Sequence, residues 1–490
     1  MKRLSFVPVG LLAFVACSHG GMKPVANSEG LTPAPSAQRT ADEAYRAAQP
    51  HPLDVPPHFE APIPVQQRLS NGIPVLIREN HALPLVVVEV LVKTGVQDDP
   101  SQAAGLSEFV AGMLPEGTRT RSAMEIATKL EDLAASLSAV SGLESSRIHL
   151  NCLTETLGDA LDVLADVTQN PAFRDEDTER MRGLKLTGLE QKKGYPPAVA
   201  ADQMARSLYG DTHPWGQPAG GTPKSVKAIR RADLARFHKT YYVANNAQIV
   251  VSGDVTPETV LPLLEARFKG WSNGRVPQAK LPPFPSMKSG RLTLVNRAAA
   301  TQSQVWLGTR IFPATSPDAV PMFVANNVLG GLFTSRLNLN LREEKGYSYG
   351  VHSQVSLNRA TGAFIAAGGI FADKTALATG EFVKELRGFG EVSEAELASA
   401  KSAIIGSLPS VLETNDAVAG ALNSLTTKGL PLDYYATLAG KVTSVTRADV
   451  RRIATSYVAP TAWQVVVVGP LKTSEAELRK LELGKTEVVP

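Results

Sequence analysis

The chain is poor in cysteine and has no hydrophobic run long enough to cross a membrane as a mature helix. Its 490 residues include only two cysteines, and no Cys-x-x-Cys, Gly-x-Ser-x-Gly or Walker-type loop is present. No two of the eight histidines lie three or four residues apart, so a pair of zinc-binding histidines on one helix is excluded. The formal net charge is only +3 and no long basic run occurs, so a nucleic-acid partner is not expected.

The first 17 residues have the pattern of an export signal. Two basic residues precede an apolar run from Phe6 to Ala16, which is too short to span a bilayer. The run ends at Cys17 in a tripeptide that resembles the bacterial lipoprotein cleavage box, although Phe14 replaces the usual leucine. This resemblance implies a lipidated Cys17 and an exported protein, membrane-anchored on the periplasmic side of the cell envelope. An ordinary secretory signal is the alternative. Cys152 ends an alternating apolar segment and is predicted to be a buried, unreactive thiol.

The remainder of the chain contains an internal duplication. Residues 231–254 and 447–470 align without a gap at an offset of 216 residues (447 − 231), and both contain an Arg-Ala-Asp triplet and end in a strand-like apolar run. Two copies at so long a period indicate two related domains rather than a solenoid. The predicted organisation is a signal peptide at 1–17, a Pro-rich tether at 18–60, domains at 61–273 and 291–490, and a linker at 274–290.

Within each half, strands come first and last and helices lie between them, which predicts an α+β fold rather than a doubly wound sheet. Strands are expected at residues 74–78, 85–93, 137–141, 147–152 and 248–252, and again at 291–295, 304–308, 347–355 and 363–369. Helices are expected in the first half at 104–114, 124–133, 157–169, 175–192 and 198–208.

The helix predicted within residues 105–118 (GLSEFVAGMLPEGT) carries Glu108, Ala111 and Gly112 on one face, because positions i, i+3 and i+4 adjoin. The string resembles the helix of the M16 (pitrilysin-like, insulinase) metallopeptidases, where those positions read His-x-x-Glu-His. In that family the two histidines ligate zinc and the glutamate activates the zinc-bound water. Glu108 offers one oxygen and the other two positions offer none. The resemblance therefore implies a degenerate zinc motif, with no metal and no catalytic residue in this chain.

The third zinc ligand of that family is a glutamate on a later helix, and the alignment places it at Gly188 or Leu189. Glu190 is one residue away, and one residue rotates a side chain about 100° around a helix. Glu190 is therefore interpreted as a surface charge rather than a surviving ligand.

A second segment, residues 330–350 (GGLFTSRLNLNLREEKGYSYG), resembles the M16 segment that carries a substrate-binding arginine and tyrosine. The resemblance assigns these roles to Arg342 and Tyr349. Arg342 is expected at the end of a helix capped by Gly346, and Tyr349 at the start of a strand. Two plainer interpretations stay open: Arg342 could complement a helix C-terminus, and Tyr349 could belong to the core on one strand face with Tyr347.

In M16 peptidases an edge strand also receives the substrate as an added strand. Residues 137–140 are the candidate, and the small side chains of Ser138 and Ala139 suit a close backbone approach. An ordinary sheet strand is the alternative.

The resemblance covers about residues 62–475 and implies two homologous α/β-roll domains that face each other around a chamber. It implies a non-catalytic, peptide-binding subunit of a two-chain zinc metallopeptidase. A partner chain with an intact His-x-x-Glu-His would hold the zinc, and Arg342 and Tyr349 would complete its active site. Two alternatives remain: an active M16 zinc endopeptidase with unusual ligands such as Glu108, and an envelope assembly or chaperone-like scaffold.

Overall fold

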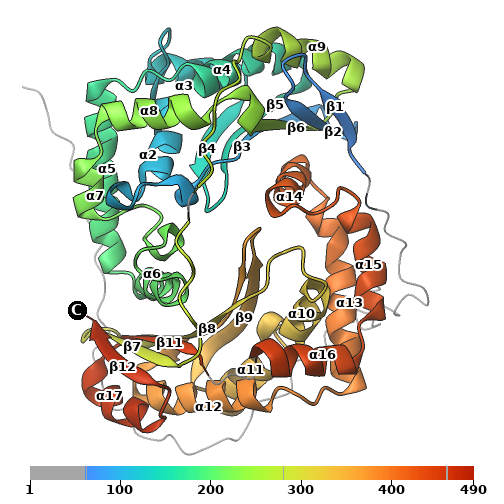
Figure 1. Ribbon diagram of the computed structural model, residues 1–490. Coiled ribbons are helices and arrows are strands. Elements are labelled where there is room, and N and C mark those ends of the chain that lie inside the picture. The colour runs from blue at the N-terminus through green and yellow to red at the C-terminus, as the bar shows by residue number, and fades with distance from the viewer. Residues whose placement is uncertain (1–60, 62, 280, 459–461, 490) are drawn as a thin grey trace, which may run out of the picture. The chain divides into compact units, whose positions relative to one another are not determined.

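The computed structural model describes residues 61, 63–279, 281–458 and 462–489 (Figure 1). The expected signal peptide, tether and lipidation site at Cys17 lie outside these residues. Among the helices that the structure describes, none combines the length and apolar composition that a bilayer span requires.

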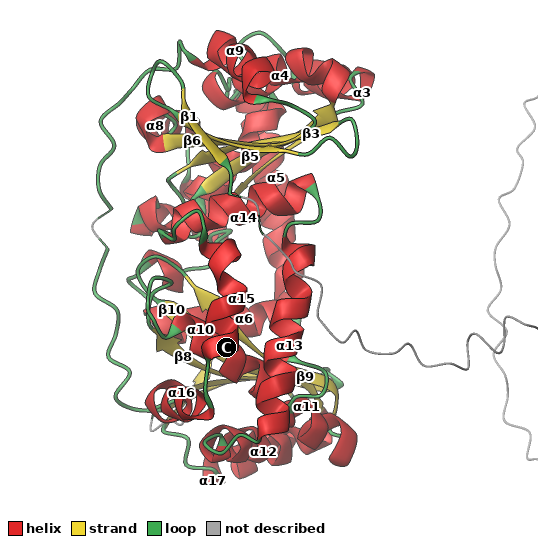
Figure 2. Ribbon diagram, turned by 90° about the vertical axis from the view of Figure 1, so that its right-hand side faces the viewer, coloured by secondary structure: helices red, strands yellow, loops and turns green. Residues whose placement is uncertain are grey.

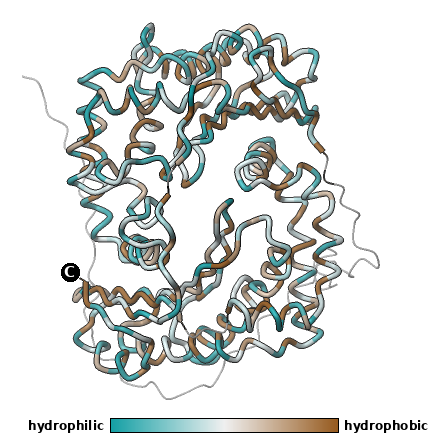
Figure 3. Tube along the Cα trace, viewed as in Figure 1, coloured by the Kyte–Doolittle hydropathy of each residue, from teal (hydrophilic) through white to brown (hydrophobic). Residues whose placement is uncertain are grey.

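The first sheet has six strands in the order β1–β2–β6–β3–β5–β4. Their bounds are β1 Val65–Arg68, β2 Pro74–Glu79, β3 Leu85–Val92, β4 Ser136–Ser141, β5 Ser146–Leu153 and β6 Ala247–Gly253. The central strand β3 is a nearly continuous apolar run (LVVVEVLV) and is buried on both faces. Figure 3 shows the same apolar character along the inner strands. Strand β1 was not predicted, because its sequence VQQR has no apolar alternation and all four residues are exposed.

Most helices of the first half lie on one side of this sheet, whereas α6 packs on the second sheet. Their bounds are α2 Leu106–Met113, α3 Ala123–Asp132, α4 Leu157–Gln169, α5 Asp175–Lys193, α6 Pro196–Tyr209, α7 Pro223–Ala228, α8 Arg231–Tyr241 and α9 Pro257–Phe268. Local signals set several starts: Ser122 and Glu125 form a reciprocal capping box at α3, and α6, α7 and α9 begin at proline. Cys152 is buried within this core, as predicted, and burial raises the pKa of its thiol to about 12.

The second half repeats the plan. Its sheet runs β12–β7–β11–β8–β10–β9, with bounds β7 Arg291–Asn296, β8 Gln302–Ile311, β9 Ser348–Leu357, β10 Gly362–Phe371, β11 Gln464–Gly469 and β12 Lys485–Val489. Its helices are α10 Ala319–Asn326, α11 Arg336–Asn338, α12 Thr375–Gly388, α13 Glu394–Val411, α14 Asn415–Lys428, α15 Tyr434–Ser444, α16 Arg447–Ile453 and α17 Leu471–Lys480. Strands β7 to β11 take the positions of β2 to β6, so the predicted duplication and the α+β class are confirmed.

One helix of each half packs against the sheet of the other half (Figures 1 and 2). Helix α6 packs on β11 and β8, where Met204 lies among buried residues of the second sheet and a Cβ at Gly308 would be 2.6 Å from its sulfur. Helix α14 packs on β6 and β3, where Leu422 meets Val87 and Val250. The helices occupy equivalent places in the two copies. The open faces of the two sheets are therefore turned toward each other, and residues 59–490 form one compact unit.

A charged network lies at the α14 contact. Glu89, the one acidic residue in β3, is only 4% exposed. His149 on β5 bridges two carboxylates, with Nδ1 3.0 Å from Glu89 and Nε2 3.0 Å from Asp416 of α14. Asn423 of α14 also donates to Glu89, and Arg147 lies 4.0 Å from it. The hydrogen bond to Glu89 is the main reason that the pKa of His149 is raised.

We expect the docking of α14 to weaken as pH rises through the raised pKa of His149. Protonated His149 can donate to both carboxylates, whereas the neutral ring donates to one only. A raised folded-state pKa stabilises the fold fully below the unfolded value of about 6.5, and this stabilisation is lost above the folded value. Hydrogen exchange of the α14 amides, corrected for intrinsic rates, should rise over this range in the wild type. His149→Gln should remove the pH dependence, and His352→Gln, on an exposed β9 position, should retain it. Equal pH profiles for all three proteins would contradict the expectation.

Candidate functional site

The start of helix α2 is fixed by two buried contacts. The Asp99 carboxylate accepts hydrogen bonds from the backbone N–H groups of Gly105 (2.9 Å) and Ser107 (2.8 Å), so it caps the helix. Gly105 has φ +89°, and a Cβ there would lie 2.7 Å from the Gly220 carbonyl. This position therefore requires glycine for its backbone conformation and for the close approach of the residue 220 loop.

The face of α2 that carries Glu108, Ala111 and Gly112 contacts a lysine of α5. Glu108 Oε1 lies 2.7 Å from Nζ of Lys185 on α5, whose side chain is 14% exposed. Ala111 is buried, and a Cβ at Gly112 would lie 3.9 Å from the methyl group of Met181. The single remaining carboxylate of the motif is thus paired with an ammonium group, and α5 side chains pack against this face of α2.

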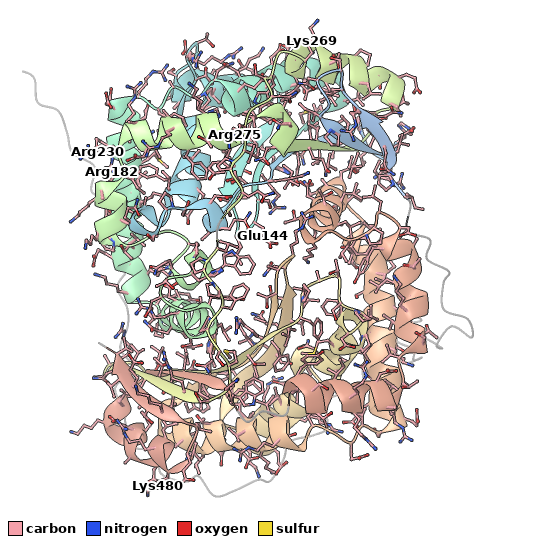
Figure 4. The ribbon with its side chains drawn as sticks, in the orientation of Figure 1. Glu144, Arg182, Arg230, Lys269, Arg275 and Lys480 are labelled. Carbon is pink, nitrogen blue, oxygen red and sulfur yellow. The ribbon has the colours of Figure 1, made fainter. Side chains whose placement is uncertain are left out.

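Lys185 and a second cation of α5 both contact the aromatic ring of Phe109 on α2. Lys185 Nζ lies 5.7 Å from the Phe109 ring centroid, and the guanidinium of Arg182, labelled in Figure 4, lies 5.6 Å from it. The sequence did not point to Lys185, because 77 residues separate it from Glu108. Helical spacing does connect it to the site, because Lys185 is four residues before Leu189 and so shares the face predicted for the third ligand.

The region of the third ligand contains no substitute. Glu190 is exposed and pairs with Lys193 at 2.8 Å, which agrees with its interpretation as a surface charge. A Cβ at Gly188 would meet no atom within 4 Å. Among the described residues, no group of three or more His, Cys, Asp or Glu side chains could hold a metal ion.

Arg342 lies in a π-helical turn, Leu339–Glu344, that follows α11. Gly346 has φ +64° and its N–H donates to the Arg342 carbonyl (3.1 Å), so glycine ends this turn as expected. The Arg342 guanidinium lies 4.4 Å from the centroid of the Phe333 ring and 3.3 Å from Glu343. Most of its hydrogen-bonding capacity remains free of the described contacts.

Tyr349 is the second residue of β9, which is an edge strand of the second sheet. Tyr349 is 78% exposed, and its ring lies in a T-shaped arrangement with that of Phe371, with 5.3 Å between the two centroids. The interpretation of Tyr349 as a core residue was wrong. The strand begins at Ser348, so the alternation rule does not place Tyr349 with Tyr347, which packs partly buried against the core.

Asn338 links the Arg342 segment to the Tyr349 strand. Its amide donates to the Phe333 carbonyl at 2.7 Å and accepts from the Val351 N–H at 3.2 Å. No hydrogen bond joins the Arg342 and Tyr349 side chains among the described residues. The two segments are joined by this buried asparagine, which sequence patterns did not identify, and by the backbone hydrogen bond from Tyr347 N–H to the Leu341 carbonyl (2.8 Å).

The predicted acceptor strand, β4, lies at an edge of the first sheet. Ser138 is exposed and pairs across the strands with His149, and Ala139 is half-buried against the core. One side of β4 pairs with β5, and its other side is not paired with any strand that the structure describes. The position at an edge agrees with the prediction, whereas its use by a peptide remains to be tested.

Comparisons with known sequences agree with these features. The family model described as "Insulinase (Peptidase family M16)" matches residues 74–215, and the one described as "Peptidase M16 inactive domain" matches residues 228–404. An uncharacterized zinc protease of Mycobacterium tuberculosis (strain ATCC 25618 / H37Rv) is 29% identical over 71% of this chain and 80% of its own length. An uncharacterized zinc protease of Streptomyces coelicolor is 25% identical over 90% of this chain and 97% of its own length.

Solved structures show the same fold. A peptidase M16 inactive domain from Pseudomonas fluorescens has a TM-score of 0.76 at 24% identity and covers 83% of this chain and 98% of its own. A protease from Helicobacter pylori has a TM-score of 0.76 at 20% identity, with 83% and 100% covered. A chain of complex III2 from Candida albicans has a TM-score of 0.71 at 17% identity, with 85% and 99% covered. By its two family matches and by its fold, the chain belongs to peptidase family M16, the insulinase family, as a member without the His-x-x-Glu-His motif.

Proposed function

We propose that the chain is the non-catalytic, peptide-binding subunit of a two-chain zinc metallopeptidase. The observation that carries this proposal is a contrast between its two halves. In the first half, the only carboxylate left in the zinc motif is paired with Lys185. In the second half, Tyr349 projects 78% exposed from an edge strand, and Arg342 is held on an exposed aromatic ring. The second half thus contains groups able to bind a peptide, whereas the first half lacks the groups needed to bind zinc.

The two exposed groups suit different parts of a peptide. The guanidinium of Arg342 presents several N–H donors in a plane, which suits a peptide carbonyl or carboxylate. The hydroxyl of Tyr349 can donate to the oxyanion that forms when a peptide carbonyl is attacked. Zinc in a partner chain with an intact motif would supply the Lewis acid and the activated water of peptide hydrolysis.

The edge strand β4 supplies a backbone surface for the same peptide. An extended segment added beside β4 would exchange main-chain hydrogen bonds with its free side, near Ser138 and Ala139. The small side chains at these positions allow another backbone to approach. This contact is independent of sequence, so it would position many peptides.

The proposal includes attachment to the bacterial envelope through Cys17. Its support is the basic start, the short apolar run and the Ala-Cys junction of the N-terminal sequence. An exported subunit would meet its zinc-bearing partner and its peptides on the periplasmic side of a membrane.

A scaffold role is the second candidate. It is favoured by the likeness to a chain of complex III2, which shows that this fold occurs as a component of a larger assembly. The zinc-protease names of the relatives would instead favour an active peptidase, but one lysine-paired carboxylate at Glu108 does not make the three-ligand site that catalytic zinc requires.

The purified chain is expected to hold no stoichiometric zinc and to hydrolyse no peptide. Lys185→Ala should not restore zinc binding, because Glu108 alone remains on that face of α2. Metal analysis after dialysis checks both proteins. About one tightly held zinc per chain in the wild type would contradict the proposal.

Cys17→Ser is expected to move the protein out of the membrane fraction or to leave its signal unprocessed. The acyl chains on the cysteine would be the membrane anchor, since the described residues contain no helix able to span a bilayer. Fractionation with N-terminal sequencing is the measurement, and Cys152→Ser is the matched control, expected to stay membrane-bound. A fully soluble wild-type protein whose mature N-terminus is not Cys17 would contradict the lipoprotein prediction.

In a complex with the zinc-bearing partner, Tyr349→Phe is expected to lower peptide turnover about 10²-fold, the usual effect of removing one oxyanion donor. Folding should be unaffected, because the Tyr349 side chain is 78% exposed. Steady-state kinetics and a melting curve are the measurements. Tyr195→Phe, at another exposed tyrosine, is the matched control and should leave both unchanged.

Arg342→Ala is expected to act mainly on apparent substrate affinity, because a positioning contact is lost in the ground and transition states alike. The same kinetics give this split between KM and kcat. If Arg342→Ala and Tyr349→Phe both melt early yet cleave normally per intact complex, the two residues are packing residues and the scaffold role is favoured.

A further inference from the structure

We propose that Phe333 forms an apolar subsite beside Arg342 that receives an aromatic or large aliphatic side chain of the bound peptide. This inference rests on the proposed function and adds the substrate class. Phe333 is 65% exposed, and it is the only exposed phenylalanine among the residues that the structure describes. All the other described phenylalanines are buried or half-buried. Core packing therefore does not explain why an aromatic residue stands at this position.

The backbone around Phe333 is unusual on both sides. A π-helical turn at Asn327–Gly331 precedes it, and a second one at Leu339–Glu344 follows it. Such turns are rare and occur often at functional sites, where they place a side chain that a regular helix would turn away. Here the second turn carries Arg342 and brings its guanidinium over the ring of Phe333.

The position of Phe333 is also fixed. Its carbonyl accepts the amide of Asn338, which is bound in turn to the β9 backbone at Val351. A Cβ at Gly330 would lie 2.6 Å from the Ser353 backbone nitrogen, so the start of this loop is in close contact with β9. The exposed ring is thus attached to the strand that carries Tyr349 rather than placed on a free loop.

The guanidinium and the ring make a composite surface. Arg342 lies over the ring at 4.4 Å, and both side chains remain open to solvent in part. A peptide oxygen bound by Arg342 would bring its neighbouring side chain to the ring. Leu339 and Tyr349, from the same segment, are also exposed apolar or aromatic groups. An apolar side chain would gain contact area there, whereas a lysine or arginine would be repelled by Arg342.

The occupant is inferred to be a peptide because of the charge and the donor geometry at Arg342. Its nearest anion, Glu343, is exposed and 3.3 Å away, and a solvated pair of this kind competes weakly with a carbonyl or carboxylate ligand. The alternative occupant is the zinc-bearing partner chain, which could cover Phe333 in an interface. The two cases predict different results for the same variant.

The test uses the purified mature chain and fluorescent ten-residue peptides that differ at one central position: Phe, Leu, Ala or Lys. The wild type should bind the Phe and Leu peptides about tenfold more tightly than the Ala peptide, and the Lys peptide most weakly. Phe333→Ala should abolish this preference, so that the Phe, Leu and Ala peptides bind with equal affinity. Phe333→Leu should keep most of the preference. Leu377→Ala, at an exposed leucine of α12, is the matched control and should behave as wild type.

The outcomes separate this inference from the proposed function. If peptides bind in an Arg342-dependent manner without any preference at the variable position, the subsite is wrong and the peptide-binding role stands. If no peptide binds, both fail. If Phe333→Ala keeps the preference but prevents assembly with the zinc-bearing chain, Phe333 belongs to the subunit interface and the inference is overturned.

Discussion

The exchange of one helix between the halves is the contact on which the rest of this structure depends. The central strands of each sheet carry buried residues on both faces, and the helices of the same half cover only one face. On the second face of the first sheet α14 covers the central strands β3 and β6, and on that of the second sheet α6 covers β8 and β11. Without the other half, these strands would expose apolar side chains to water, such as Val87 and Val250 of the first sheet. The two domains are therefore related by duplication but are not independent in stability.

The same packing determines where the two edge strands lie. The turn between β4 and β5 carries Glu144, labelled in Figure 4, whose carboxylate oxygens accept the backbone N–H of Arg359 at 3.1 Å. Arg359 lies in the turn between β9 and β10. The hairpin that contains the proposed peptide-accepting strand thus touches the hairpin that contains Tyr349. Glu144 is half-buried, and this burial raises the pKa of its carboxyl group.

Sequence patterns predicted the elements whose residues are buried with a clear period. The apolar run of β3, the helix α2 and the pairing of α8–β6 with α16–β11 all follow from such patterns. The edge strands β1 and β12 escaped prediction because their residues are mostly exposed and carry no apolar alternation. The ion pair of Glu108 and Lys185 escaped for a different reason, since no local pattern links residues 77 positions apart.

The resemblance of α2 to the zinc helix of M16 peptidases has a structural cause that is independent of zinc. Phe109, Val110 and Met113 are core residues of the first half, and Gly105 is required for the close approach of the Gly220 loop. These positions would be retained in any chain that keeps the fold. Their match to active M16 peptidases therefore supports the fold. Only Glu108, Ala111 and Gly112, at the positions of the zinc motif, indicate whether the chain can bind zinc.

Glu108, the remaining carboxylate of the motif, also has a structural role. Glu108 is 40% exposed and Lys185 is 14% exposed, so the lysine is the more desolvated member of the pair. Lys185 and Arg182 both lie against Phe109, where two cations repel each other. An anion next to the buried ammonium offsets its desolvation and this repulsion, and Glu108 supplies it. The carboxylate thus has a structural partner within the chain, and its presence is no argument for a surviving zinc site.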